Sequence, residues 1–100
     1  MINPDAGVVE VHEYSLREEV EERAFLTAST QAEVAMSECE GYVSREVLQN
    51  EQGYLDVVRW DHHEDADAAI VLRDEEGAIA TLFELLDRES LSRRRFAPIG

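Results

Sequence analysis

Residues Tyr42–Asp61, YVSREVLQNEQGYLDVVRWD, decide the fold of this chain. Two runs rich in β-branched and aromatic residues, 42–49 and 54–61, lie on either side of four polar residues that end in Gly53. A short polar link that ends in glycine is typical of a β-hairpin, in which the two runs pair as antiparallel strands. We therefore expect two paired strands in the middle of the chain.

The sequence before the hairpin predicts one strand and one helix. Residues 7–16, GVVEVHEYSL, begin with valines and then alternate, which is typical of a strand. Ser15 and Glu18 have the spacing of a capping box, and apolar residues follow at steps of three and four. We therefore expect an amphipathic helix over about residues 18–39, and Gly41 suits its C-terminal end.

The sequence after the hairpin predicts helical structure in two parts and a last strand. Asp61 and Glu64 have the spacing of a helix start, so we expect a helix from about His62. The polar stretch 74–77 interrupts it, and apolar residues at helical spacing then predict a second short helix. Residues 91–98 are expected to form a fourth strand.

The order β-α-β-β-α-β predicts an α+β, ferredoxin-like fold. Its four-stranded antiparallel sheet carries both helical parts on one face. The length of 100 residues predicts a single domain, residues 1–100, in which we expect residues 1–6 to form a loose arm. The other sheet face would be uncovered, which favours a homodimer in which two copies bury that face together.

The chain is strongly acidic, with 23 Asp and Glu residues, nine Arg, no Lys and a formal net charge of −14. Such a surface repels nucleic acid and anionic lipid, so we expect neither as a partner. Two explanations stay open, namely a surface for a protein partner and halophilic adaptation to a salt-rich cytoplasm. The complete lack of Lys, with acids along the whole chain, favours adaptation to salt.

The sequence also predicts the cellular location of the protein. No apolar run reaches the ~20 residues of a membrane span, and no signal peptide is visible at the N-terminus. The single cysteine, Cys39, excludes an intrachain disulfide and fits a reducing compartment. We therefore expect a cytoplasmic protein without a membrane contact.

Three segments resemble the antibiotic biosynthesis monooxygenase superfamily of small dimeric α/β-barrel proteins. They are VVEVHEYSL at 8–16, GYVSREVLQNEQGYLDVVRW at 41–60 and HEDADAA at 63–69, and the resemblance extends over about residues 7–97. It implies two sheets packed back to back as a barrel, with a pocket between the sheet and the helices of each subunit. The superfamily includes cofactor-free monooxygenases that act on aromatic polyketide-like substrates, haem-degrading monooxygenases and members without known activity.

The resemblance also implies candidate site residues. His12 falls near a pocket-facing polar position of the haem-degrading members, and a histidine there could act as a base. Tyr14, on the same strand face, would donate a hydrogen bond to a substrate oxygen. Trp60 matches a tryptophan that lines the pocket of haem-degrading relatives, and we expect Phe25 and Phe83 to contact substrate with it. Each of these residues also has a structural explanation, as a hydrogen-bonded histidine or a core aromatic.

Metal and haem chemistry have little support in the sequence. Haem-degrading members use a histidine on the second helix, and residues 66–86 contain none, so we expect no cofactor. His62 and His63 are neighbours at a helix start and do not converge on one ion, so we expect a solvated helix end and no metal site.

The arginines of the chain have two explanations. Arg45 and Arg59 lie on the paired strands, and we expect them to form cross-strand ion pairs with Glu46 and Asp56. The run at 93–95 alternates between faces of a strand, and it either pairs with carboxylates or steers an anionic ligand to a pocket.

The sequence leaves two functions open. The first is a homodimeric, cofactor-independent monooxygenase in which His12 takes a proton from a small aromatic or polyketide-like substrate and the carbanion reacts with dioxygen. The second is a non-catalytic homodimeric module that binds a small apolar ligand or a protein. The first requires a pocket with room for an aromatic ring and with His12 facing it, whereas the second fits an aliphatic pocket with His12 turned to solvent.

Overall fold

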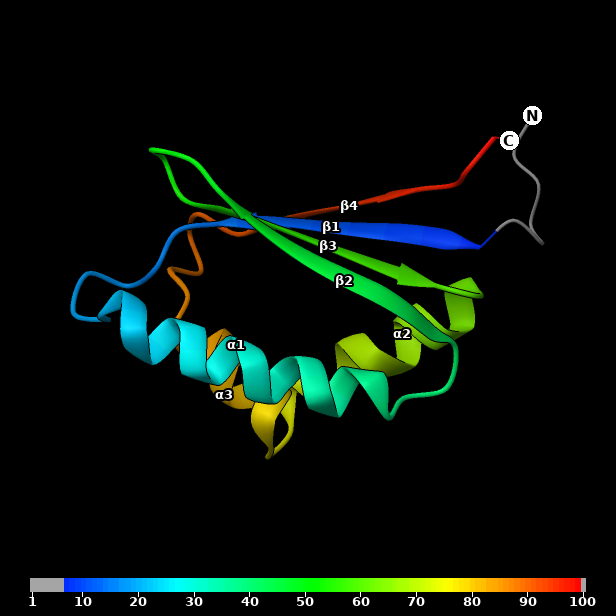
Figure 1. Ribbon diagram of the computed structural model, residues 1–100, viewed down its shortest axis with the longest axis horizontal. Coiled ribbons are helices and arrows are strands. Elements are labelled where there is room, and N and C mark those ends of the chain that lie inside the picture. Colours follow the sequence, from blue (N-terminus) through cyan, green and yellow to red (C-terminus); the bar gives the residue numbers. More distant parts are fainter. Residues whose placement is uncertain (1–6, 100) are drawn as a thin grey trace.

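The computed structural model describes residues 7–99, and the arm expected at residues 1–6 lies outside them. The chain folds as a four-stranded antiparallel sheet with its helices on one face (Figure 1). The strands are β1 (Val8–Tyr14), β2 (Tyr42–Gln49), β3 (Tyr54–Trp60) and β4 (Ser92–Phe96). The helices are α1 (Glu22–Ser37), α2 (His63–Val71), the 3-10 turn η2 (Leu72–Asp74) and α3 (Ala78–Glu84). The strand order is β2-β3-β1-β4, which confirms the ferredoxin-like fold.

The central hairpin forms where the sequence predicts it, with β2 and β3 paired along their length. The side-chain oxygen of Asn50 closes the turn by accepting hydrogen bonds from the backbone N–H groups of Gln52 (2.8 Å) and Gly53 (3.0 Å). Gly53 lies so close to β1 that a Cβ atom here would come within 2.4 Å of the Tyr14 carbonyl oxygen. Glycine is required at this position by the contact between the turn and β1.

The first helix begins later than expected because the residues before it pair with the end of α3. The capping box predicted at Ser15 is wrong, since α1 begins at Glu22. The backbone N–H of Arg17 donates to the carbonyl of Leu85, and that of Asp87 donates to the carbonyl of Ser15, both at 2.9 Å. These bonds hold residues 15–17 extended beside the end of α3, so a helix cannot start there.

The helical layer covers one face of the sheet. The break expected between the second and third helical segments is confirmed by η2 and the turn that follows it. Helices α1 and α3 pack against each other beneath the sheet, and α2 lies beneath the same face (Figure 1). Within residues 7–99, no helix is long and apolar enough to cross a membrane.

The other face of the sheet is open in this chain (Figure 1). The pairing of β1 with β3 and β4 alternates buried and outward positions, so one set of side chains faces the helices and the other faces away. The outward set combines apolar residues, namely Val9, Val11, Leu48, Leu55, Val57 and Phe96, with polar and charged ones, among them Glu13, Glu46, Arg59 and Arg94. Leu48 and Phe96 are 45% and 51% exposed. This surface, called here the open face, is the one expected to mediate dimerisation.

Candidate functional site

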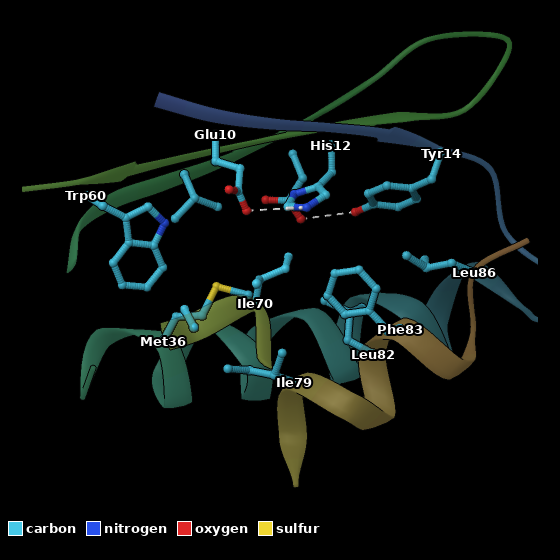
Figure 2. A pocket seen from close by; sticks show the side chains of 13 residues that line it. Glu10, His12, Tyr14, Met36, Trp60, Ile70, Ile79, Leu82, Phe83 and Leu86 are labelled. Atoms are coloured by element: carbon cyan, nitrogen blue, oxygen red, sulfur yellow. Dashed lines mark hydrogen bonds and ion pairs between the residues drawn. The ribbon is translucent and has the colours of Figure 1, made fainter. Parts of the chain in front are cut away.

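A cavity lies between the sheet and the helices (Figure 2). Its sheet wall carries polar side chains, and its helix wall is apolar. The sheet contributes Glu10, His12, Tyr14, Asp56, Val58 and Trp60. The helices and the loop after α3 contribute Met36, Ala69, Ile70, Ile79, Leu82, Phe83 and Leu86.

The period of a strand explains the polar wall. Side chains at alternate positions of β1 share a face, so Glu10, His12 and Tyr14 all point toward the helices. The register of β1 with β3 places Asp56 opposite His12. We call these four residues the polar row. Burying such groups costs free energy unless they are paired, so a polar row in a cavity marks a candidate site.

Asp56 is held by two side chains. Arg45 of β2 donates from Nε to Oδ1 at 2.9 Å and from Nη2 to Oδ2 at 2.7 Å, which confirms one of the expected cross-strand ion pairs. Among the described residues, Arg59 and Glu46 form none. The Tyr14 hydroxyl donates to Oδ2 at 3.2 Å. The Arg45 side chain is only 1% exposed, and it also donates to the carbonyl of Ser29 at 3.0 Å. The pair therefore fastens α1 to the sheet.

Glu10 is held from the other edge of the sheet by Arg95 of β4. Arg95 Nε donates to Glu10 Oε2 at 2.5 Å, and Arg95 Nη1 lies 2.7 Å from a carboxylate oxygen of Asp67 on α2. Glu10 is buried, whereas the Asp67 side chain is 66% exposed. On the open face, Arg94 pairs with Glu13 at 3.7 Å. The prediction that the arginine run pairs with carboxylates is therefore confirmed for two of its members.

His12 is the one member of the polar row without a close partner. Its ring is 6% exposed and meets the edge of Phe83 at 5.8 Å between centroids. Nε2 lies 3.5 Å from Glu10 Oε1, beyond the range of an N–H···O hydrogen bond, and no hydrogen-bond partner for it occurs among the described residues. Burial lowers the pKa of His12 from its ordinary value, against the opposite effect of Glu10 and Asp56. A pKa below the ordinary value leaves the ring mostly neutral at pH 7, and a neutral imidazole is able to accept a proton.

The Tyr14 hydroxyl already donates its hydrogen bond to Asp56. Burial, followed by the charge of Asp56, raises the pKa of Tyr14 above its usual range. Its ring packs against Phe25 and Tyr54, each at 6.0 Å between centroids. A hydrogen bond from Tyr14 to a substrate would compete with the bond to Asp56, and this role stays a prediction.

The three aromatic residues expected to contact substrate lie in different places. Trp60 and Phe83 line the cavity (Figure 2), and Trp60 also meets Tyr42 edge-on at 5.8 Å between centroids. Phe25 is fully buried in the core, where its ring lies 4.5 Å from that of Tyr54, and it is not among the lining residues. Contact of any of the three with a substrate stays a prediction.

The cavity is small, with a volume of about 30 Å³. A site of this size holds about one or two water molecules, whereas an apolar cavity that binds benzene has ~150 Å³. The room expected for an aromatic ring is not present in this conformation. No group of three or more His, Cys, Asp or Glu side chains within residues 7–99 is placed to hold a metal ion. His62, at the start of α2, is exposed and pairs with Asp65 at 3.3 Å.

Sequence reasoning missed the roles of Glu10 and Arg95. The strand period places Glu10 on the same face as His12, which was the available signal. The contact with Arg95 depends on the register of β1 with β4, two strands from opposite ends of the chain, and the sequence does not predict that register.

Comparison with solved structures relates this architecture to a known group of proteins. SnoaB, a cofactor-independent oxygenase from Streptomyces nogalater, is similar over 95% of this chain and 95% of its own, with a TM-score of 0.78 and 13% identity. A candidate antibiotic biosynthesis monooxygenase from Nitrosomonas europaea is similar over 99% of this chain and 96% of its own, with a TM-score of 0.75 and 13% identity. The chain has the fold of the antibiotic biosynthesis monooxygenases.

A second candidate antibiotic biosynthesis monooxygenase, from Chloroflexus aurantiacus J-10-fl, is similar over 94% of each chain, with a TM-score of 0.68 and 18% identity. The resemblance seen in the sequence is therefore confirmed at the level of the fold. Sequence identities this low establish only a shared fold, so the reaction has to be argued from the residues of the site. No protein-family model matches the chain, and no curated protein matches it.

Proposed function

We propose that this protein is a cofactor-independent, monooxygenase-like enzyme that acts on a small, electron-rich aromatic compound with an acidic C–H group. The observation that carries the proposal is His12, a buried neutral histidine that lines the cavity and whose Nε2 has no hydrogen-bond partner among residues 7–99. A neutral imidazole is a general base at physiological pH. The fold shared with SnoaB, itself a cofactor-independent oxygenase, adds support.

In the proposed reaction, His12 Nε2 removes a proton from the methylene carbon of an anthrone-type ring system. The resulting carbanion is delocalised over the rings and supplies an electron pair to dioxygen, which forms the new C–O bond. The peroxide takes the proton back from His12 and restores the neutral imidazole. Loss of the second proton from the same carbon, with cleavage of the O–O bond, gives a carbonyl group and water. One dioxygen is consumed for each methylene that becomes a carbonyl.

Substrate entry requires the helix wall to move, because the cavity holds about 30 Å³. Arg45 fastens α1 to the sheet through buried bonds, but α2 is tied to Arg95 through the exposed carboxylate of Asp67. Exposed ion pairs contribute only ~0–1 kcal/mol, so α2 is the more easily displaced wall. We place the entry beside Ile70, which projects from α2 into the cavity (Figure 2).

We also propose that two copies pair through the open face. Leu48 and Phe96 on this face are about half exposed, and Val9 and Val57 lie between them in the sheet. Burying such a surface against a second copy removes apolar area from water. The net charge of −14 opposes association, so salt should favour it by screening. Sedimentation at low and high salt tests this, and a monomer under both conditions would contradict it.

A non-catalytic homodimeric module that binds a small ligand or a protein is the second candidate. The small volume of the cavity favours it, because no aromatic ring fits in this conformation. The polar row argues against a non-catalytic module, because an apolar wall would be less costly to bury than two carboxylates and a histidine.

Turnover distinguishes the two candidates. Chelator-treated protein should oxidise an anthrone-type compound with uptake of one dioxygen per carbonyl formed. His12→Ala should lose about 10²-fold or more of kcat, the usual contribution of a general base. His62→Ala is the matched control, because His62 is exposed at a helix start and should keep full activity. Undiminished turnover by His12→Ala would remove the role of His12, and a wild-type protein that turns over no acidic aromatic compound would favour the binding module.

A further inference from the structure

Glu10 is a buried carboxylate whose two oxygens have different surroundings. Oε2 accepts the hydrogen bond from Arg95 Nε at 2.5 Å, whereas Oε1 faces Nε2 of His12 at 3.5 Å. The Glu10 side chain is only 4% exposed, so water does not readily take the place of a partner for Oε1. A buried carboxylate that packing alone had selected would be less costly as an apolar residue. The position of Oε1 beside His12 therefore needs an explanation beyond stability.

Two buried carboxylates beside His12 are already paired with guanidinium groups. Glu10 and Asp56 carry negative charges, and Arg45 and Arg95 carry the matching positive charges. A proton on His12 adds one positive charge to this buried group. Asp56 has both oxygens occupied by Arg45, so Oε1 of Glu10 is the carboxylate oxygen left to face the new charge.

We propose that Glu10 is a positioning residue for His12: Arg95 fixes its carboxylate, and the negative charge at Oε1 stabilises the positive charge that His12 gains when it takes a proton from the substrate. The inference rests on the proposed function of His12 as the base. The 3.5 Å between Oε1 and Nε2 is close enough for direct attraction between the two charges. This attraction is stronger at a buried site than in water. It holds the imidazolium in place until the proton returns to the peroxide.

Charges on every element packed against His12 act on its titration. Glu10 on β1 and Asp56 on β3 raise the pKa of His12, whereas Arg93 on β4 and Arg73 on η2 lower it, and burial lowers it most. Removing the charge of Glu10 leaves the lowering effects in place and takes away the first of the raising ones. His12 should then titrate at a still lower pH and should be a weaker base.

The test is an NMR titration of the histidine ring resonances. Glu10→Gln keeps the size of the side chain and an acceptor oxygen but removes the charge. Glu13→Gln is the matched control, because Glu13 lies on the same strand but is exposed on the opposite face. We expect His12 to titrate at a lower pH in Glu10→Gln and at an unchanged pH in Glu13→Gln. His62 and His63, both exposed, serve as references in the same spectra.

A second variant and a second readout cover the case in which Glu10→Gln does not fold. Glu10→Asp keeps the charge and should keep the pKa of His12 closer to the wild-type value. In the wild-type protein, the Glu10 Cδ resonance should move at the midpoint of the His12 titration. The proposal would be overturned if Glu10→Gln folds and His12 titrates in it at an unchanged pH. It would also be overturned if the Glu10 Cδ resonance of the wild-type protein does not move at the midpoint of the His12 titration.

Failure of the proposed function looks different. Coupled titrations of Glu10 and His12 in a protein without turnover would overturn the role of His12 as a catalytic base while showing the contact itself. Full turnover with uncoupled titrations would overturn only the role given to Glu10.

Discussion

Replacing Arg45 by Met removes the side chain that ties α1 to the sheet. The guanidinium is 1% exposed and bonds to both carboxylate oxygens of Asp56 and to the carbonyl of Ser29. Methionine keeps a flexible apolar stem of similar length but donates none of these bonds. The Asp56 carboxylate, itself 7% exposed, would be left with the Tyr14 hydroxyl as its one described donor.

The cost of Arg45→Met follows from the burial of the pair. Removing one partner of a buried ion pair costs about 3–5 kcal/mol, because the other charge stays uncompensated. The whole free energy of unfolding of a small domain is about 5–15 kcal/mol, so the variant should be close to unfolding. Arg17→Met is the matched control, since Arg17 lies outside the sheet and pairs with Glu19, with side chains 56% and 66% exposed. Its cost should be ~0–1 kcal/mol.

Urea unfolding measures both variants at one fixed protein concentration, because the stability of a dimer depends on concentration. Trp60 is the only tryptophan in the chain and is buried, so its fluorescence reports unfolding directly. If Arg45→Met costs no more than Arg17→Met, the buried ion pair does not hold the helical layer. In Arg45→Met the uncompensated Asp56 should also raise the pKa of His12, the opposite direction from Glu10→Gln.

Two further predictions concern stability. Since burial lowers the pKa of His12 below its ordinary value of 6.5, the unfolded chain binds more protons than the folded one as the pH falls below 6.5. As the pH falls from 6.5 to the pKa of His12 in the folded state, the free energy of unfolding should decrease more in the wild-type protein than in His12→Gln. A difference in free energy of unfolding between the two proteins that stays constant over this pH range would contradict the prediction. Gly53→Ala places a Cβ at 2.4 Å from the Tyr14 carbonyl oxygen, whereas at Gly77, which also has a positive φ, nothing lies within 4 Å. In urea unfolding, Gly53→Ala should cost about 1–3 kcal/mol more than Gly77→Ala, and equal costs would show that the turn moves away from β1 freely.

The parts of the fold that depend on local chemistry were predictable from the sequence. The hairpin is one, because Asn50 and Gly53 form the turn with their own neighbours. The start of α1 was not, because the bonds that keep Ser15 out of a helix come from residues 85–87, about 70 positions along the chain. Pairing between distant segments has no signature in the periodicity of either segment.

In the candidate site too, local features were predictable from the sequence and contacts between distant segments were not. Strand alternation predicted that His12 and Tyr14 share a face. The pairing of the hairpin strands predicted ion pairs among their charged residues, of which Arg45 with Asp56 forms. The contact of Glu10 with Arg95 depends on which strand lies at the sheet edge. The volume of the cavity depends on how closely α2 and α3 approach the sheet, which side-chain packing sets and residue spacing does not predict.

The dependence of kcat/KM on pH tests the role of His12 most directly, because its acid limb reports the pKa of the essential base in the free enzyme. We expect activity toward an anthrone-type compound to fall at low pH, with a midpoint equal to that of the His12 resonances in the NMR titration. We expect this limb to be missing from the residual activity of His12→Ala. A midpoint that differs from the titration of His12, or the same limb in His12→Ala, would contradict the proposal that His12 is the base.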